Sequence, residues 1–495
     1  MVAGTPLVVF GTVAIYLLAV LGIGEYARRR TRSDREDFFM ASRSFGTVVL
    51  LFALLATNMT AFVLIGAPGL AYSAGVGAYG YVVGFATLSF PVVFGTVGYR
   101  LWLAGREFGH ITPAQMFNHR FDSDHLGTLV MALMTFWTVP YFLLGAIGSG
   151  IAFRGLTQGT VPYWAGALLP LVIVFIYVLS GGMRGTGLTN VFQGAVFIVF
   201  LWGLVMLLAS RLGGFSGATA AVMEQAPQLA SRAGPPPFAP RMWFSFALVV
   251  TLNILMYPHM FRRILVALDE RSLRRMVILY PIGLMLTWVP AVLVGFWGAG
   301  QIGDLTGQEV DQILPLLVGQ YTPPLVIGLA LAGILAAIMS SLDGQTLAVS
   351  TMFSEDIIRQ YTDAFSEAGE IRLARVMVGV ILAITFVLSL LRPGTIVGIA
   401  EFAFSGYALI FFPLVVGLYW RNANQYGAWV GLLWGFVGLW GFEIGLIPAS
   451  LTFGFMAFIP VFVVQIVLTL AVGYFGPTPP TERVRSYFQL YDGVW

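Results

Sequence analysis

The sequence predicts an all-α polytopic membrane protein with about 13 transmembrane helices. Of its 495 residues, 58% are hydrophobic and only 10% are charged, whereas a soluble domain is about one quarter charged. So few charges cannot cover the surface of a soluble protein of this size. Apolar stretches long enough to cross a bilayer recur along most of the chain. We therefore expect the membrane part to be nearly the whole protein.

Each predicted span is a stretch of about 20 mostly apolar residues, the length that crosses the hydrocarbon core. The first span is not a signal peptide, because no positive segment precedes it and arginines follow it instead. In chain order the spans cover residues 6–26, 45–72, 76–104, 127–152, 164–183, 189–210, 242–260, 276–299, 323–353, 374–391, 395–420, 427–446 and 452–474.

Arginine placement predicts how these helices are oriented. The side of a membrane protein that carries more Lys and Arg faces the cytoplasm. With the N-terminus outside, the inner loops carry 21 of the 26 basic residues. The outer loops carry the other five, Arg154, Arg211, Arg232, Arg241 and Arg392. We therefore expect a multi-pass protein of the cell (inner) membrane, with the N-terminus outside and the C-terminus in the cytoplasm.

Composition and motifs argue against several other classes of protein. A net charge of +3 without a basic stripe excludes a nucleic-acid partner, and the lack of cysteine excludes disulfides and thiolate metal sites. No nucleotide-binding loop is present, and the histidines lack metal-ligand spacing. Neither an enzyme nor an ATP-driven pump is predicted. No cofactor and no obligate protein partner are expected.

Residues 55–69 predict a helix that is interrupted inside the membrane. Thr57, Asn58 and Thr60 are polar, and a Gly-Ala-Pro-Gly sequence follows at 66–69. Unpaired backbone carbonyls are tolerated at this depth only where they line a cavity or bind an ion. Interrupted helices of this kind form the central sites of secondary transporters, whereas a channel needs a continuous pore lining. A proline-kinked but continuous helix is the alternative, and this segment alone leaves both open.

A second polar stretch lies inside the span at 323–353. Ala337, Ser340 and Ser341 stand at helical spacings that place two hydroxyls and one carbonyl on one face. The alternative is that the serines bond carbonyls of their own helix. Asp343 follows three residues after Ser340, however, and a carboxylate inside a span is costly and usually functional. Oxygen ligands without nitrogen or sulfur favour a hard cation such as sodium.

At this point the sequence resembles the solute:sodium symporter family, which includes sodium/proline, sodium/pantothenate, sodium/glucose and sodium/sialate carriers. Seven motifs carry the resemblance in the same order over nearly the whole chain. They are DFFMASR at 37–43, ATNM at 56–59 with GAPG at 66–69, TPAQMFNHR at 112–120, GGMR at 181–184 with TNVFQ at 189–193, PH at 258–259 with Arg262 and Arg263, AAIMSS at 336–341, and GAWVG at 427–431.

The resemblance implies a leucine-transporter-like core of two inverted five-helix repeats, each opening with a broken helix. The second repeat offers only Thr251, Leu252 and Asn253 for its break, and no glycine. The implied organisation is an extra N-terminal helix and Arg-rich inner loop at 1–44, a first repeat at 45–210, an external loop with a short helix near 218–230 at 211–241, a second repeat at 242–420, two additional helices at 421–474, and a cytoplasmic tail at 475–495.

The resemblance also implies a sodium site between the two polar stretches. Its ligands are expected to be the carbonyls of Ala56, Met59 and Ala337 and the hydroxyls of Ser340 and Ser341. Some family members bind a second sodium through an aspartate that is Asn190 here and a serine that is Asp343 here. We therefore hypothesise that Asn190 and Asp343 face each other and form a second cation or proton site, the alternative being that Asp343 only helps helices to pack.

The implied activity is secondary active symport, which couples inward sodium flux to uptake of a small organic solute by alternating access. The sequence leaves the solute open among amino acids, pantothenate, monocarboxylates and sugar-like molecules. A proton-coupled symporter and a transporter-like membrane sensor are the alternatives. The expected partners are the solute, sodium as a co-transported ligand, and the lipid bilayer. Candidate substrate-binding residues near the bilayer middle are Thr57, Asn58, Thr60, Tyr79, Trp137, Tyr141, Asn253 and Tyr257.

Overall fold

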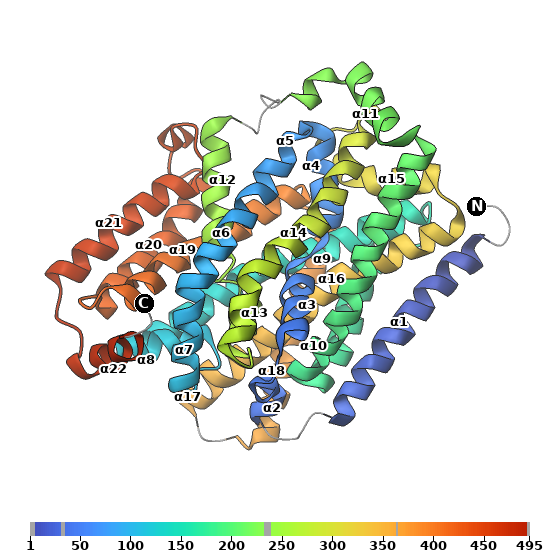
Figure 1. Cartoon of the computed structure of the whole chain (residues 1–495). Helices are drawn as coiled ribbons and strands as arrows, with labels where there is room; N and C mark the ends of the chain where they lie inside the picture. The colour runs from blue at the N-terminus through green and yellow to red at the C-terminus, as the bar shows by residue number, and fades with distance from the viewer. Residues whose placement is uncertain (1–4, 31–34, 232–238, 363–364, 493–495) are drawn as a thin grey trace.

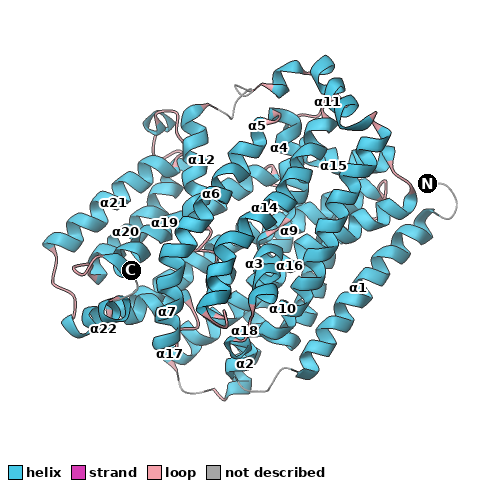
Figure 2. Ribbon diagram, viewed as in Figure 1, coloured by secondary structure: helices cyan, strands magenta, loops and turns pink. Residues whose placement is uncertain are grey.

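The computed structural model describes residues 5–30, 35–231, 239–362 and 365–492, and packs them as one bundle of helices (Figure 1). Helices and connecting loops account for all the described residues, and no strand is drawn among them (Figure 2). A single pair of residues, Phe45 and Ala267, forms a β-type bridge within this described part. The prediction of an all-helical protein is therefore confirmed.

The α-helices, in chain order, are α1 (Thr5–Arg30), α2 (Arg35–Met40), α3 (Thr47–Asn58), α4 (Ala67–Ala74), α5 (Gly77–Tyr79), α6 (Phe85–Val93), α7 (Tyr99–Glu107), α8 (Pro113–Phe121), α9 (Asp124–Leu156), α10 (Tyr163–Arg211), α11 (Gly214–Gln225), α12 (Pro240–Asn253), α13 (Pro258–Leu265), α14 (Glu270–Gly298), α15 (Ile313–Tyr321), α16 (Pro324–Phe353), α17 (Arg359–Tyr361), α18 (Glu367–Leu391), α19 (Ile396–Tyr419), α20 (Gln425–Glu443), α21 (Phe458–Phe475) and α22 (Thr481–Tyr491). Short 3₁₀ segments are η1 (Ala41–Arg43), η5 (Pro227–Ala230), η6 (Gly307–Gln312) and η8 (Ala449–Thr452), and wider π-helical turns are η2 (Phe62–Gly66), η3 (Gly80–Gly84), η4 (Phe94–Gly98) and η7 (Ser354–Ile358).

The described residues form nine helices that are long and apolar enough to cross a membrane, or eleven if each of two bent helix pairs counts as one span. The predicted count of 13 is therefore not confirmed. The two remaining predicted spans do coincide with helices: a shorter apolar helix covers Tyr163–Val178, and α20 covers Gln425–Glu443. The model thus agrees with the predicted positions of the helices more closely than with their number as membrane spans.

The first bent pair joins α3 to α4 at an angle of 59°. The chain leaves the helix at Met59, whose backbone is extended, with φ −84° and ψ 112°. The Thr60 hydroxyl then accepts a hydrogen bond from the backbone N–H of Phe62 at 2.9 Å, which satisfies one of the donors left open at a new helix start. The helix then continues from Phe62 to Ala74, and Pro68 lies just after the π-helical turn η2 passes into α4. The alternative of a continuous, proline-kinked helix is therefore wrong.

The second bent pair joins α12 to α13 at 45°, so the expected broken helix at the start of the second repeat is confirmed. The break lies at 254–257, immediately after the residues to which the sequence pointed. Pro258 is the first residue of α13, and Tyr257 before it is extended with φ −64° and ψ 122°. This is the conformation that a following proline imposes.

Two predicted spans, 164–183 and 189–210, correspond to the two helical parts of α10, which meet at a sharp turn at Gly182. Gly182 has φ 56° and ψ −157°, a region open to glycine and costly for other residues. An added Cβ there would lie 2.6 Å from the Phe38 carbonyl oxygen. The expected inner loop at 184–188 is therefore helical, because one glycine provides the whole turn.

The centre of the bundle is formed by α16, which contacts α1, α3, α9, α10 and α13. Of its most apolar window, 83% is buried inside the protein, against 28% for α1. A helix buried on all sides is apolar all round, whereas a peripheral helix leaves its apolar side chains to the lipid. The polar residues of α16 are thus enclosed by protein, which positions them for a site.

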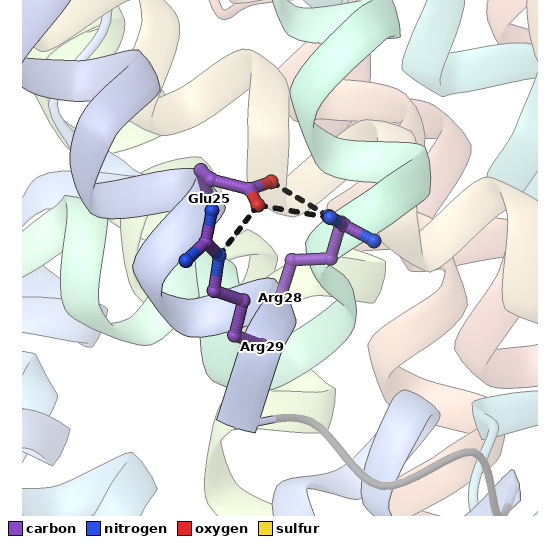
Figure 3. A network of polar contacts seen from close by, with 3 residues as sticks. All are labelled: Glu25, Arg28 and Arg29. Carbon is purple, nitrogen blue, oxygen red and sulfur yellow. Dashed lines mark hydrogen bonds and ion pairs between the residues drawn. The ribbon is translucent and has the colours of Figure 1, made fainter.

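The predicted inner face carries arginine-rich helix ends. At the end of α1 the Glu25 carboxylate accepts hydrogen bonds from Arg28 and Arg29 at 2.6–2.9 Å (Figure 3). Such exposed ion pairs contribute little to stability, because water and salt screen them. Arg32 and Arg232, which were counted for the orientation, lie outside the described residues. The orientation itself stays a prediction.

The two chain segments outside the core are also helical. The expected short helix near 218–230 corresponds to α11 and η5. The tail at 475–495 contains α22, which packs against α7 and α8. The Tyr487 hydroxyl lies 3.2 Å from Nδ1 of His119, and Arg483 pairs with Asp122 at 3.2 Å. The tail therefore covers part of the same face as α8 (Figure 1).

Candidate ion and solute site

The two polar stretches singled out in the sequence meet at the break of the first helix pair. The Ser340 hydroxyl oxygen on α16 lies 2.8 Å from the carbonyl oxygen of Ala56 on α3, and 2.9 Å from that of Ala337. All three residues are fully buried. Three of the five expected sodium ligands therefore lie within one hydrogen-bonding cluster, which joins the central helix to the broken one.

The other two expected ligands lie nearby in sequence but make different contacts. The Ser341 hydroxyl donates to the carbonyl of Ile338 in its own helix at 3.1 Å, which is the alternative that the sequence left open. Met59 is fully buried, and its N–H still bonds the Leu55 and Ala56 carbonyls at 3.1 and 3.3 Å. The backbone N–H of Met59, the residue at which α3 ends, is thus still hydrogen-bonded to the last turn of the helix.

Asp343 lies in a polar cluster between α10 and α16. It is fully buried, and its Oδ2 accepts hydrogen bonds from the hydroxyls of Tyr177 and Thr189, both at 3.2 Å. Its Oδ1 has no hydrogen-bond partner within the described part of the chain. The buried guanidinium of Arg263 attracts this carboxylate. A buried carboxylate with one open oxygen can accept either a cation or a proton.

Asn190 does not bond to Asp343, although the two residues lie on packed helices. Its amide nitrogen donates to the Thr57 hydroxyl at 2.8 Å, and the residue that reaches Asp343 is its neighbour Thr189. The direct pairing that we hypothesised is thus replaced by two separate contacts. Asn190 connects α10 to the broken helix, and Thr189 connects α10 to α16.

A small cavity lies between the two broken helices. Four of the expected substrate-binding residues line it: Asn58, Thr60, Asn253 and Tyr257. The Asn58 amide donates to the Tyr280 hydroxyl at 2.7 Å, and the buried Asn253 amide nitrogen has no partner among the described residues. The cavity volume is about 40 Å³, whereas ligand pockets usually measure about 300–1,000 Å³. An organic solute can fit only if the lining side chains or helices move apart.

The other four expected substrate-binding residues do not line this cavity. Thr57 faces Asn190, and Tyr79 lies half-buried in α5. The Trp137 ring packs against Gly406, where an added Cβ would lie 2.2 Å from the ring. The Tyr141 ring packs behind the cavity, with its centroid 5.0 Å from that of Tyr257. Trp137 thus fits the packing role that aromatic residues usually have in helix bundles.

The sequence reasoning missed the apolar walls of the cavity. Phe62, Trp288 and Phe404 line it, with Phe62 edge-on to both other rings at 5.4 Å. No local signal distinguishes these residues from the many other aromatic residues in the spans. Phe62 could have been found from its position within the interrupted segment, two residues after Thr60.

Two histidines on the predicted inner face stay neutral. Burial, with smaller effects of His119 and Arg43, lowers the pKa of His110 to about 3. Burial and the nearby Arg483 also lower the pKa of His119. Neither imidazole therefore carries a proton at neutral pH. The buried carboxylate of the described site is thus a better candidate for proton chemistry than these histidines.

Known proteins share this fold. A solved structure of a Na⁺-coupled sialic acid symporter superposes with a TM-score of 0.78 at 14% identity, covering 96% of this chain and 99% of that one. The nucleobase-cation-symport-1 transporter Mhp1, in a closed conformation, superposes with a TM-score of 0.56 at 14% identity, covering 90% and 97%. Both are transporters of the leucine-transporter fold, and the expected fold is confirmed at that level.

Sequence relatives are transporters too. The sodium/pantothenate symporter of Haemophilus influenzae is 29% identical over 471 residues, which are 90% of this chain and 94% of the relative. The osmoregulated proline transporter OpuE of Bacillus subtilis is 26% identical and covers 96% of both chains. The model of the sodium:solute symporter family matches residues 38–435. This chain therefore belongs to the sodium:solute symporter family.

Proposed function

We propose that the protein couples inward sodium flux to the uptake of a small organic solute by alternating access. The observation that carries this proposal is the contact between the Ser340 hydroxyl and the Ala56 carbonyl at 2.8 Å. It brings a hydroxyl oxygen of the central helix to a backbone carbonyl at the end of the broken helix, the kind of place where carriers with discontinuous helices coordinate ions. Sodium would take the place of this hydrogen bond: the Ser340 hydroxyl would turn its proton away and coordinate the ion through its oxygen beside the Ala56 carbonyl, and Met59, Ala337 and Ser341 would complete the ligands.

The ion would act by joining a fixed helix to a movable one. A cation that binds α3 and α16 together favours the conformation in which they are close. Asn58, Thr60 and Phe62, on either side of the same break, line part of the solute cavity. The ion and the solute would therefore favour the same conformation. One charge that moves down 100 mV provides about 2.3 kcal/mol. We propose the same orientation as above, with the N-terminus outside, so that this flux is inward.

The solute would bind in the cavity between the broken helices after it widens. The cavity offers the amide groups of Asn58 and Asn253 as donors and acceptors for a polar group of the solute. The Trp288 and Phe404 rings offer apolar surface. This mixture suits an amino acid, pantothenate, a monocarboxylate or a sugar-like molecule. The relatives named for pantothenate and proline are consistent with this range. The sensor alternative has no specific observation in its favour.

The test of sodium binding uses a matched pair of variants in α16. Ser340→Ala removes the hydroxyl that contacts Ala56, whereas Thr351→Val removes a buried hydroxyl that bonds only the Leu347 carbonyl of its own helix at 2.7 Å. Thermal unfolding of the purified protein is followed while sodium chloride replaces choline chloride. We expect sodium to raise the melting temperature of the wild type and of Thr351→Val, but much less that of Ser340→Ala. Equal sodium responses in all three proteins would refute the site.

Proton coupling is the second candidate, because Asp343 is buried with Oδ1 open. In this case Asp343 would take up a proton from outside and release it inside, while Tyr177 and Thr189 hold its other oxygen. Asp343→Asn keeps the shape and removes the titration. In proteoliposomes, uptake that follows a pH gradient and is lost in Asp343→Asn would support proton coupling. Uptake that needs sodium and persists in this variant would reject it.

A further inference from the structure

A second, larger cavity lies apart from the ion and solute site, at the ends of α9, α10 and α18. Its volume is about 370 Å³, which is within the range of small-molecule sites. Arg154 and Gln158 come from the end of α9 and the turn after it, Tyr163 from the start of α10, Gln312 from η6, and Arg392 from the residue after α18. We call this cavity the arginine pocket. Two of the five arginines on the predicted outer face lie in it.

Arg392 is fixed through its backbone, and its guanidinium lies over one aromatic ring. Its backbone adopts φ 46° and ψ 65° at the end of α18, which is unusual for a residue with a Cβ. The Gln308 side chain donates to its carbonyl at 3.0 Å, and the guanidinium carbon lies 5.4 Å from the centre of the Tyr163 ring. Its Nε is buried without a hydrogen-bond partner in the described residues. Buried N–H groups without an acceptor are uncommon in folded proteins, so this one is a place where a ligand could supply the acceptor.

Neither arginine of the pocket forms an ion pair within the described ranges. The carboxylate that Arg392 attracts is Asp311, which is 1% exposed. Its Oδ2 accepts the Ile396 N–H at 3.1 Å, and its Oδ1 lies against Gly69 rather than in the pocket. Two positive groups thus share one cavity with two amide side chains and no carboxylate among the lining residues.

We propose that the arginine pocket binds a small carboxylate anion. Guanidinium groups bind carboxylates through paired N–H donors, and the Gln158 and Gln312 amides add further donors. The anion would bridge two parts of the protein. Gln312 belongs to η6, which packs on α4, the second half of the first broken helix, whereas Arg154 and Arg392 belong to α9 and the α18–α19 link. Binding would therefore hold η6 and α4 against these helices and stabilise that arrangement.

The experiment measures thermal unfolding of the purified full-length protein with succinate as the choline salt. Choline chloride of equal ionic strength controls for salt, and succinamide, the uncharged diamide, controls for shape. The variants are Arg154→Gln and Arg392→Gln. Arg211→Gln is the matched control, because Arg211 is another exposed arginine of the predicted outer face and does not line the pocket. Arg392→Lys tests whether the planar guanidinium is needed.

We expect saturating succinate to raise the melting temperature of the wild type and of Arg211→Gln by about 1–2 °C. The shift should disappear in Arg154→Gln and Arg392→Gln and shrink in Arg392→Lys, although all variants unfold cooperatively in choline chloride. The proposal is overturned if succinate and chloride act alike, if succinamide matches succinate, or if the pocket variants keep the full shift. Equal protection by inorganic phosphate would overturn the preference for carboxylates. If Arg392→Gln does not fold, the loss or retention of the shift in Arg154→Gln decides.

Discussion

Replacing Gly344 by alanine should push apart the two helices that form the ion site, α3 and α16, without changing any of the proposed ligands. Gly344 lies on α16 against the broken helix, and a Cβ there would lie 2.3 Å from Cγ2 of Thr57. Carbon atoms normally approach to about 3.5 Å. Turning Cγ2 of Thr57 aside would also move the hydroxyl that accepts from Asn190, so the contact favours a shift of about 1 Å between α3 and α16. Ala56 precedes Thr57, and its contact with Ser340 would then lengthen from 2.8 Å beyond hydrogen-bonding distance. Loss of one charge-assisted contact is worth about 1.5–3 kcal/mol, or roughly 10- to 100-fold in sodium affinity.

The same geometry predicts a rescue. Thr57→Ser removes Cγ2 and keeps the hydroxyl that accepts from Asn190. The next contacts of the added Cβ, His259 Cβ at 3.4 Å and Thr57 Cβ at 3.5 Å, are close to normal. Sodium titrations by thermal shift should therefore show weak binding in Gly344→Ala and recovery in the double variant, with Thr57→Ser alone near the wild type. Unchanged sodium affinity in Gly344→Ala, or no recovery in the double variant, would refute this reasoning.

Two further predictions concern the outer loop and the solute cavity. Burial raises the pKa of Asp311 from 3.8 to about 6. Between these pH values the folded protein therefore binds more protons than the unfolded chain. Its unfolding free energy falls by about 3 kcal/mol as the pH rises through this range. Asp311→Asn removes this loss of stability. The melting temperature of the variant minus that of the wild type should therefore increase from pH 4 to pH 7. A difference that stays constant over this range would contradict the raised pKa of Asp311. Trp288→Ala enlarges the cavity beside Phe62 and should change which solutes stabilise the protein while leaving the sodium response intact; a lost sodium response would show that Trp288 also supports the ion site.

The sequence predicted the broken helices because their chemistry is local. Asn58 and Thr60, with glycine and Pro68 beyond them, favour an interruption by their own hydrogen bonding and backbone preferences. The second break contains no glycine, and its signal is Pro258, which restricts Tyr257 before it. The turn at Gly182 also has a local cause, since glycine tolerates φ 56°. Hydropathy predicted the two helical parts that this turn joins, but it placed a loop at 184–188, because it could not show that a single residue makes the turn.

The candidate site was less predictable, because its contacts join residues far apart in the chain. Spacing placed Ser340 and Ser341 on one face, and both hydroxyls bond carbonyls of their own helix. Only the packing shows that Ser340 also reaches Ala56. Likewise nothing local distinguishes Thr189 from Asn190 as the neighbour of Asp343: the two lie about 100° apart around the axis of α10, and only the packing of the helices decides which of them faces α16. Aromatic walls such as Trp288 depend on how two broken helices pack, which no short motif records.

The most direct test of the proposed coupling is gradient-driven accumulation in proteoliposomes, with a solute first identified by a thermal-shift screen with and without sodium. An inward sodium gradient at equal pH on both sides should drive the labelled solute above its external concentration, and Ser340→Ala should abolish this accumulation while Thr351→Val retains it. Accumulation of equal size without sodium, driven by a pH gradient alone, would contradict sodium coupling.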